Sequence, residues 1–418
     1  MRILQYSGAF VGAQKQIEEA IHYQLKELGH ESRILYTVGE SQDSEIIRCE
    51  SRLGNLLRRG LIKLFGNDHR FAFFATKKLI RYIALYKPDI VHLHTIHHGY
   101  IDYEMLFHHL GEKQIPLVYT LHDMWPFTGG CYHYTNCGCE RFLTGCDNCP
   151  KRDAIDCPPK RTSASFQTKR SLFKLQKSIR FVAVSDWVSE ETKKSMLQEY
   201  PLYTVWNAVE QPMECADMTA LKQTNRFQIV GVAASWTERK GIWRFFELAQ
   251  LLGDDYEILL VGSADAKLRN EAPENIRFLG RITDRRQLYE LYRTSDLHVS
   301  MSLEETFGMT FVEAAFVGTR SIGFNSTAIP GVLRKVHGIT VSAGDVSAVE
   351  EEIRSMARNI HLCRLSAEEQ REIKAAFSAK EMAKQYITIY EAKGDIDVRN
   401  NDKNRSMVNC TERSVFSS

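Results

Sequence analysis

Short runs of β-branched and aromatic residues alternate with helix-period stretches along most of this chain, and that alternation constrains its fold more than any other feature. Candidate strands of a first block lie at residues 2–7, 31–37, 89–94, 117–121 and 180–185. A second block repeats the pattern, with candidate strands at residues 227–233, 256–262, 276–280, 297–302 and 320–323. Strands separated by helices pair in parallel, because a parallel neighbour needs a crossover connection. The sequence therefore predicts two α/β domains, each with a parallel sheet covered by helices.

With 418 residues the chain is long enough for two domains that each have a core. We place the first Rossmann-like domain at residues 1–205 and the second at residues 206–375, because a polar, proline-containing segment lies at about 206–225. A helical pattern covers about 367–393, and residues 395–418 are polar and aperiodic, which predicts a disordered tail. A cleft between the two domains is the expected ligand site.

The N-terminal segment 1–7 is typical of a strand and lacks the apolar core of a signal peptide. No window of the sequence approaches the run of about 18 apolar residues that spans a bilayer. We therefore predict a cytoplasmic protein, in which the ten cysteines are thiols or metal ligands rather than disulfides.

Two carboxylates, Glu305 and Glu313, lie eight positions apart just after the candidate strand 297–302, with Gly308 between them. A glycine lets backbone N–H groups approach a ligand closely, and the start of the following helix favours a phosphate. Glu313 falls about two turns along that helix, where its carboxylate can chelate a sugar diol. This pattern indicates a nucleotide-sugar site at the carboxyl end of a parallel strand. The alternative is an amphipathic helix with solvated glutamates.

Residues 305–314, ETFGMTFVEA, resemble the paired-glutamate signature of retaining glycosyltransferases of family 4, which have the GT-B fold. The resemblance implies two Rossmann-like domains that face each other across a cleft, with a C-terminal helix at 376–394 crossing back to the first domain. It also implies that Glu313 binds the ribose of the nucleotide and that Glu305 contacts the donor sugar. Thr306, Phe307 and Gly308 would line the donor site, where backbone N–H groups meet the diphosphate or sugar.

Lys240 and Gly241 follow the first strand of the second block, where a lysine can meet a diphosphate as a point charge. In the resembled family an arginine usually lies five positions before this lysine. That position is Ser235 here, which is a departure from the family pattern, and Arg239 can supply the missing charge. A solvated basic turn is the alternative for both cations.

Three further residues are candidates for the donor site. Arg281 follows the candidate strand 276–280, in a loop that often faces the nucleotide base in the resembled family. Gly8 and Gly12 would let the loop after the first strand approach the donor, although a plain βα turn would contain the same glycines. These residues complete the predicted donor set.

His122 and Asp123 follow the candidate strand 117–121, so they are expected at the cleft. In the resembled family the matching histidine lies beside the transferred sugar, and Asp123 would orient His122 or an acceptor hydroxyl. Retaining transfer in this family needs no catalytic metal and no enzyme nucleophile. A second histidine group places His92 and His94 on one strand face, which suits a metal site, an acceptor loop or simple core packing.

Six cysteines crowd into the predicted insertion at residues 129–159 of the first domain. Cys146 and Cys149 have the two-residue spacing of a zinc knuckle, and Cys131 and Cys139 are candidates for the second pair. The segment from His122 to Pro150 resembles a subgroup of family 4 that includes colanic acid and other surface polysaccharide glycosyltransferases. We predict a structural zinc site, with reduced buried thiols as the alternative and an iron–sulfur cluster as a third interpretation.

Residues 51–88 contain nine Lys and Arg against one acid, Asp68, mixed with apolar residues. Apolar and basic residues at helical spacing over residues 53–65 predict an interfacial helix on an anionic membrane, where a lipid-linked acceptor would be found. A solvated helix that covers the sheet is the alternative. No nucleic-acid-binding motif accompanies the charge, so no nucleic acid partner is expected.

Together these features predict a cytoplasmic retaining glycosyltransferase at the inner face of the cell membrane. It would move a sugar from a nucleotide-sugar donor onto a lipid-linked saccharide of a bacterial exopolysaccharide, capsule or O-antigen. A nucleotide-sugar epimerase of the same fold is one alternative. A zinc-stabilised, non-catalytic binding protein with a decayed donor site is the other, and Ser235 would be a sign of that decay.

Overall fold

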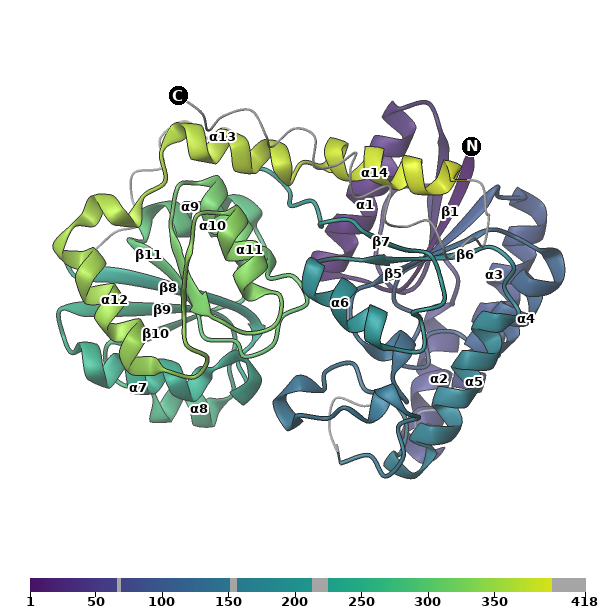
Figure 1. Ribbon diagram of the computed structural model, residues 1–418, viewed down its shortest axis with the longest axis horizontal. Coiled ribbons are helices and arrows are strands. Elements are labelled where there is room, and N and C mark those ends of the chain that lie inside the picture. Colours follow the sequence, from purple (N-terminus) through teal and green to yellow (C-terminus); the bar gives the residue numbers. More distant parts are fainter. Residues whose placement is uncertain (66–68, 151–155, 213–224, 393–418) are drawn as a thin grey trace.

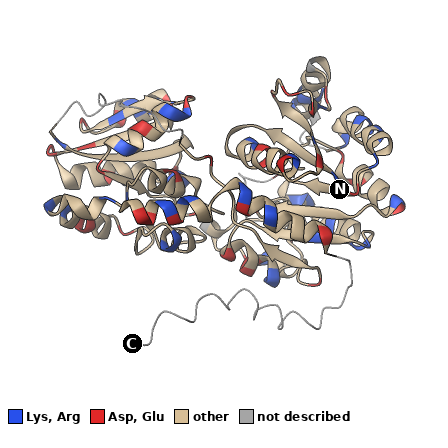
Figure 2. Cartoon of the chain, turned by 90° about the horizontal axis from the view of Figure 1, so that it is seen from above, with Lys and Arg blue, Asp and Glu red and all other residues tan. Residues whose placement is uncertain are grey.

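Figure 1 shows two α/β lobes that lie side by side, with the last helices passing over both of them. The computed structural model describes residues 1–65, 69–150, 156–212 and 225–392. The charged side chains lie mostly on helices and loops of both lobes, whereas the strands between them are mostly uncharged (Figure 2). This division is expected of parallel sheets, which are covered on both faces.

The first sheet has seven parallel strands in the order β3-β2-β1-β4-β5-β6-β7. They are β1 (Arg2–Phe10), β2 (Glu31–Gly39), β3 (Ile46–Arg48), β4 (Ile90–Leu93), β5 (Leu117–Leu121), β6 (Ile179–Ala183) and β7 (Leu202–Thr204). The helices around them are α1 (Gly12–Glu27), α2 (Arg52–Phe65), α3 (Phe73–Tyr86), α4 (Tyr103–Lys113), α5 (Thr162–Lys174) and α6 (Asp186–Lys194). Every residue of β4, β5 and β6 is buried, which explains why these strands are mostly apolar.

The second sheet has six parallel strands in the order β10-β9-β8-β11-β12-β13. They are β8 (Phe227–Ser235), β9 (Tyr256–Ser263), β10 (Ile276–Gly280), β11 (Leu297–Ser300), β12 (Ser321–Phe324) and β13 (Ile339–Val341). Its helices are α7 (Ile242–Leu252), α8 (Ala266–Glu271), α9 (Arg285–Thr294), α10 (Met309–Phe316), α11 (Ile329–Lys335) and α12 (Val346–Arg358). The two predicted α/β domains are therefore confirmed.

The strand order reverses at one place in each sheet, between β1 and β4 in the first and between β8 and β11 in the second. Such a switch point opens a crevice at the carboxyl ends of the strands, because the connections leave in opposite directions. The loops that follow β4, β5, β8 and β11 carry most of the predicted site residues. The topology alone thus brings the candidate residues of each domain to one edge.

The C-terminal helical pattern is two helices, α13 (Ala367–Ala376) and α14 (Ala379–Glu391), rather than one continuous helix over 367–393. Ser378 begins the second helix, and its side chain accepts a hydrogen bond from Glu381 N at 3.2 Å. The break lets α14 return to the first domain, as predicted (Figure 1). There the hydroxyl groups of Tyr386 and Tyr390 reach Thr120 Oγ1 and His92 Nδ1, both at 2.8 Å.

Several predicted boundaries were wrong. β1 continues to Phe10, so Gly8 lies within a strand, and α1 begins at Gly12 rather than at Lys15. Three edge strands of three residues each, β3, β7 and β13, were not predicted because so short a run has no detectable periodicity. The predicted disordered tail at 395–418 lies outside the described residues.

Candidate active site

The loop between β8 and α7 packs tightly against the loop that follows β11. Gly241 has φ of +78°, and a Cβ at this position would collide with the backbone oxygen of Met301. Only glycine tolerates both the conformation and the contact. The close approach places Lys240 beside Glu305, and their side chains form an ion pair through Nζ and Oε1. Two residues that are 65 positions apart in the sequence thereby meet at one edge of the sheet.

Glu305 is held firmly in this loop. Its backbone N–H donates to Thr327 Oγ1 at 3.0 Å, and its carbonyl oxygen accepts from Ala328 N at 3.2 Å. Burial opposes ionisation of the carboxyl, but the charge and hydrogen bond of Lys240 outweigh it and lower the pKa of Glu305. The pair is therefore a carboxylate and an ammonium at neutral pH.

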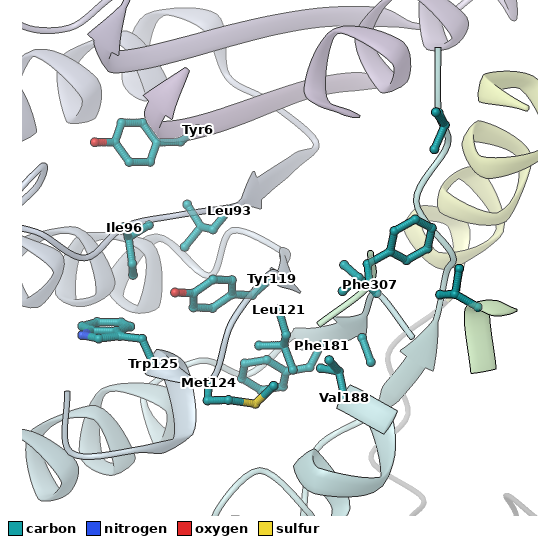
Figure 3. Packing of buried hydrophobic residues seen from close by; sticks show 14 of the residues in the cluster. Tyr6, Leu93, Ile96, Tyr119, Leu121, Met124, Trp125, Phe181, Val188 and Phe307 are labelled. Atoms are coloured by element: carbon teal, nitrogen blue, oxygen red, sulfur yellow. The ribbon is translucent and has the colours of Figure 1, made fainter. Parts of the chain in front are cut away.

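The residues that directly follow Glu305 contact the first domain. Ser185 Oγ, at the start of α6, donates to Thr306 O at 2.7 Å. The ring of Phe307 lies 5.8 Å from that of Trp206, and it belongs to the same buried cluster as Leu121 and Phe181 of the first domain (Figure 3). The side chain of Phe307 therefore packs against the segment between the domains. Only its backbone is available to a donor.

Gly308 begins α10 with φ of +93°, as a turn into a helix requires at this position. Glu313, on that helix, is 5% exposed. Its Oε1 accepts a hydrogen bond from Arg285 Nη1 at 2.8 Å, and its Oε2 accepts one from the hydroxyl of Tyr292 at 3.1 Å. Both carboxylate oxygens of Glu313, the residue predicted to bind the ribose, thus accept hydrogen bonds from side chains of α9.

Arg285 was not predicted as a site residue. Burial lowers its pKa, but the carboxylates of Glu313 and Glu210 and the phenol of Tyr289 produce a net increase. Its Nε lies 3.5 Å from Glu210 Oε2, so the guanidinium connects the helix that carries Glu313 with the segment between the domains. The signal in the sequence was Asp284, a helix-capping residue immediately before two arginines, which places Arg285 in the first turn of α9.

The other donor candidates lie apart from the paired carboxylates. Arg281 is exposed after β10, and Ser235 is exposed at the end of β8. Arg239 lies closer, because its positive charge lowers the pKa of both Glu304 and Glu305. Arg239 is thus near enough to these two carboxylates to affect them electrostatically.

The two glycines of the first domain differ in their surroundings. Gly8 donates its N–H to Thr95 O at 2.6 Å, and a Cβ there would collide with Tyr100. Packing inside the domain therefore explains Gly8 without any donor contact. Gly12 has φ of +57°, and a Cβ there would meet no atom within 4 Å. Gly12 begins α1 in open space.

His122 lies after β5 in a chain of buried polar side chains. Its Nε2 is 3.0 Å from His94 Nδ1, and Nε2 of His94 is 3.1 Å from Gln5 Oε1. Burial lowers the pKa of His122 to about 4, so its imidazole is neutral at neutral pH. His92 and His94 share one strand face, as predicted, with ring centroids 4.1 Å apart.

Asp123 has partners other than His122. Its Oδ1 accepts from Trp125 N at 2.9 Å, and its Oδ2 lies 3.2 Å from His97 Nε2. His122 therefore forms its hydrogen bond with His94 rather than with Asp123. Burial raises the pKa of Asp123, which keeps its proton affinity above that of an ordinary aspartate.

The predicted zinc site is not formed in the described part of the chain. Cys131, Cys139, Cys146 and Cys149 all line one cavity of about 20 Å³, but no three possible ligands lie together as a metal-binding group among the residues that the structure describes. Cys131 Sγ donates instead to His133 O at 2.8 Å, and Cys146 Sγ accepts from Gly129 N at 3.0 Å. Burial raises the pKa of Cys146 to about 11, so it remains a thiol. The structure matches the alternative of reduced, partly buried thiols.

Models of two related sequence families match successive parts of this chain. The one described as Glycosyltransferase Family 4 covers residues 12–211, and the one described as Glycosyl transferases group 1 covers residues 226–359. The chain belongs to glycosyltransferase family 4. It is therefore a glycosyltransferase.

A curated relative supports this membership over nearly the full length. The putative colanic acid biosynthesis glycosyl transferase WcaC of Escherichia coli strain K12 is 25% identical over 415 residues, which cover 94% of this chain and 100% of WcaC. The match thus extends through both α/β domains.

Solved structures agree on the fold. Sucrose-phosphate synthase from Thermosynechococcus elongatus has a TM-score of 0.70 at 16% identity, and the match covers 93% of this chain and 98% of that one. HepE from Anabaena, solved in complex with UDP and glucose, has a TM-score of 0.63 at 15% identity, covering 93% and 99%. This family 4 enzyme has the GT-B fold, with two Rossmann-like domains that face each other across a cleft.

One contact of this family 4 enzyme joins the cysteine-rich segment to the loop between β11 and α10, which contains Glu304 and Glu305 and which we call the donor loop. Glu304 has no exposed surface, and its Oε1 lies 3.3 Å from Nδ1 of His133. Burial raises the pKa of Glu304, but the neighbouring His133, Thr135 and Arg239 outweigh it, and the net pKa is lowered. The segment that precedes Glu305 is thus anchored to the first domain by an ionised carboxylate.

Proposed function

We propose that this glycosyltransferase moves a sugar from a nucleotide-sugar donor with retention of anomeric configuration. The observation that carries this proposal is the ion pair between Lys240 and Glu305, which lies on the same edge of the second sheet as Glu313. In the proposed complex Glu313 binds the ribose and Glu305 contacts the donor sugar. Lys240, Arg239 and the backbone around Gly308 bind the diphosphate.

The ion pairs of the site would rearrange when a donor binds. In the free protein Lys240 neutralises Glu305, and Arg285 neutralises Glu313. The diphosphate would replace Glu305 as the partner of Lys240, which frees the carboxylate to accept hydrogen bonds from sugar hydroxyl groups. During transfer, the cation stabilises the negative charge that develops on the departing diphosphate. The acceptor attacks from the face that the diphosphate leaves, so the mechanism needs no enzyme nucleophile.

The proposed acceptor is a lipid-linked saccharide of a surface polysaccharide. WcaC is named for colanic acid biosynthesis, which supports a saccharide acceptor of this class. No helix among the described residues has both the length and the apolar character to cross a membrane. Contact with lipid would instead come from the surface of the first domain, in a protein that works in the cytoplasm at the inner face of the membrane.

Helix α2 supports this membrane contact because its apolar side chains point outward. Leu53, Leu56, Leu57 and Leu64 are between 62% and 76% exposed. Arg58 is buried on the opposite side of the helix, where its Nε donates to Glu50 Oε1 at 3.1 Å. An apolar groove of about 650 Å³ lies beside α2 and is lined by leucines of α2 and by two phenylalanines that follow it: Leu56, Leu57, Leu61, Leu64, Phe71 and Phe74. Exposed Arg59 and Lys63 suit an anionic lipid surface.

The donor proposal is tested by thermal shift with UDP-, GDP- and dTDP-sugars, comparing wild type with Glu313→Ala and with Glu351→Ala. Glu351 is an exposed residue of α12 in the same domain and serves as the control. We expect one nucleotide class to stabilise wild type and the control, and not Glu313→Ala. Stabilisation of Glu313→Ala by the same amount would refute the assigned site. Donor turnover without acceptor would instead favour the epimerase, and binding without any turnover would favour the decayed site.

The membrane proposal is tested by cosedimentation with phosphatidylglycerol vesicles and with phosphatidylcholine vesicles. Leu56→Glu is expected to lose binding to the anionic vesicles, because it places a charge in the outward apolar face. Leu251→Glu is the matched control, since Leu251 is 43% exposed on α7 of the second domain. Equal binding by the two variants would contradict a role for α2.

A further inference from the structure

Three side chains from neighbouring strands of the first sheet form a directed chain of hydrogen bonds that ends at His122. Gln5 lies in β1, His94 directly follows β4, and His122 directly follows β5. Gln5 and His94 are at most 1% exposed. His94 bonds both neighbours, with 3.1 Å to Gln5 Oε1 and 3.0 Å to His122 Nε2. Both ring nitrogens of His94 are therefore used.

The orientation of Gln5 determines the direction of these bonds. Its Nε2 lies 3.5 Å from the backbone oxygen of Glu18, so the reversed amide would place two acceptor oxygens face to face. The amide oxygen of Gln5 can only accept, which requires a hydrogen on Nε2 of His94. Burial lowers the pKa of His94 well below its ordinary value, so the ring is neutral and carries one hydrogen only. Its Nδ1 is then an acceptor, and Nε2 of His122 must be the donor.

We propose that Gln5 and His94 are positioning residues that hold His122 as the Nε2–H tautomer, so that its Nδ1 accepts a hydrogen bond from a hydroxyl of the donor sugar. This inference rests on the proposed function. None of the described residues hydrogen-bonds to Nδ1 of His122, and Asp123 is occupied by His97 and by Trp125 N. Among the described residues, the lone pair on Nδ1 of His122 is thus the unpartnered end of this series of hydrogen bonds.

A fixed acceptor selects among donor sugars. A hydroxyl at the matching sugar carbon satisfies Nδ1 of His122, whereas a deoxy sugar leaves this half-buried nitrogen without its sugar partner. If the tautomer were free to change, the ring could present Nδ1–H instead and would donate a hydrogen bond to a sugar oxygen. Gln5 and His94 therefore act on specificity without contacting the donor.

His92 provides a matched control because it is equally buried and does not belong to this chain. Its Nε2 bonds Thr120 Oγ1 at 2.8 Å, and its Nδ1 bonds the hydroxyl of Tyr390 at 2.8 Å. Hydroxyl groups donate or accept, so these partners impose no direction. A change at His92 should perturb packing at a similar depth without altering the tautomer of His122.

The direct test is nuclear magnetic resonance of the full-length protein labelled with ¹⁵N-histidine, without any donor. His122→Asn identifies the His122 signals by their loss. Two-bond correlations should show a protonated Nε2 and a bare Nδ1 for His122 in wild type and in His92→Phe, and a mixture of tautomers in Gln5→Leu. A wild-type His122 that carries its hydrogen on Nδ1 would overturn the proposal, whether or not the protein proves to be a transferase.

The functional test compares Kd values for a donor and its monodeoxy analogues, measured by calorimetry. The donor is the one that the thermal shift panel selects among UDP-glucose, UDP-galactose, UDP-N-acetylglucosamine, GDP-mannose and dTDP-rhamnose. One analogue should bind wild type and His92→Phe about tenfold more weakly than the donor. In His94→Phe this ratio should fall to about twofold or less, and His94→Asn, whose amide oxygen can accept from His122, should restore it.

The outcomes separate a positioning role from a structural one. If His94→Phe weakens the donor and every analogue by the same factor, His94 only supports the fold and the proposal is overturned. If no donor binds wild type, the proposed function fails, and the tautomer measured by resonance still decides whether Gln5 and His94 direct His122.

Discussion

Replacing Lys240 by methionine removes an ammonium group and keeps most of the aliphatic stem, so it tests the ion pair with Glu305 directly. A hydrogen bond to a charged group contributes about 1.5–3 kcal/mol. The two side chains are 23% and 20% exposed, and screening by solvent reduces the expected loss to about 1–2 kcal/mol. For a domain of this size the loss should lower Tm by about 2–8 °C at pH 7.

The pH dependence of this effect has a defined sign. The pKa of Glu305 is lowered in the folded protein, since Lys240 outweighs the opposing effect of burial. Its contribution to stability is therefore complete above the unfolded pKa of about 4.3 and is lost as the pH falls through the lower, folded value. The Tm difference between wild type and Lys240→Met should narrow as the pH is lowered to 4 and below.

The same variant should lose activity far beyond its loss of stability. If Lys240 neutralises the departing diphosphate, its removal should lower kcat/KM by about 10²–10³, the cost of removing one preorganised stabilising group. Calorimetric scans and steady-state kinetics of Lys240→Met are compared with Lys267→Met, a control whose side chain is 74% exposed. A kcat/KM within about twofold of wild type, or a Tm difference that widens in acid, would refute the reasoning.

Three further changes test other parts of the structure. Arg285→Ala should raise the KM for the donor about tenfold with little change in kcat, because Glu313 loses the guanidinium that orients it. An unchanged KM in initial-rate assays would contradict this role. Gly241→Ala should lower Tm more than the exposed-loop control Gly344→Ala, because both glycines have positive φ but only Gly241 packs against Met301. Treatment with EDTA should leave Tm and the circular dichroism spectrum unchanged, since the cysteine-rich segment holds thiols; a fall in Tm that zinc reverses would show that a metal is bound after all.

Patterns within single segments predicted the fold well, whereas contacts between segments could not be predicted from the sequence. The strands at Leu117–Leu121 and Ile276–Gly280 were placed to the residue, because each is a short run of strand-forming residues bounded by turn residues. The sequence placed Lys240 and Glu305 after strands of the same sheet, but it did not predict their ion pair. Arg285 escaped because several exposed arginines surround it, and only the bond to Glu313 distinguishes it from them.

The cysteines show the opposite failure. The spacing of Cys146 and Cys149 suggested a zinc site, since two thiols one turn apart are typical of zinc ligands. Spacing cannot specify where the second pair lies, and in the structure Cys131 is bonded to the backbone of its own turn. A tetrahedral site needs four sulfur atoms about 2.3 Å from one metal, and that requirement is tertiary rather than local.

The position of the donor loop depends on the first domain as much as on the second. Ser185 holds the carbonyl of Thr306, and His133 holds the carboxylate of Glu304, so residues on both sides of Glu305 are tied across the cleft. A fully buried carboxylate is costly unless it is paired, and Glu304 is paired only while the cysteine-rich segment is in place. The segment thus positions Glu304, the residue directly before Glu305. A change that moves His133 should alter the position of Glu305, even though the two residues belong to different domains.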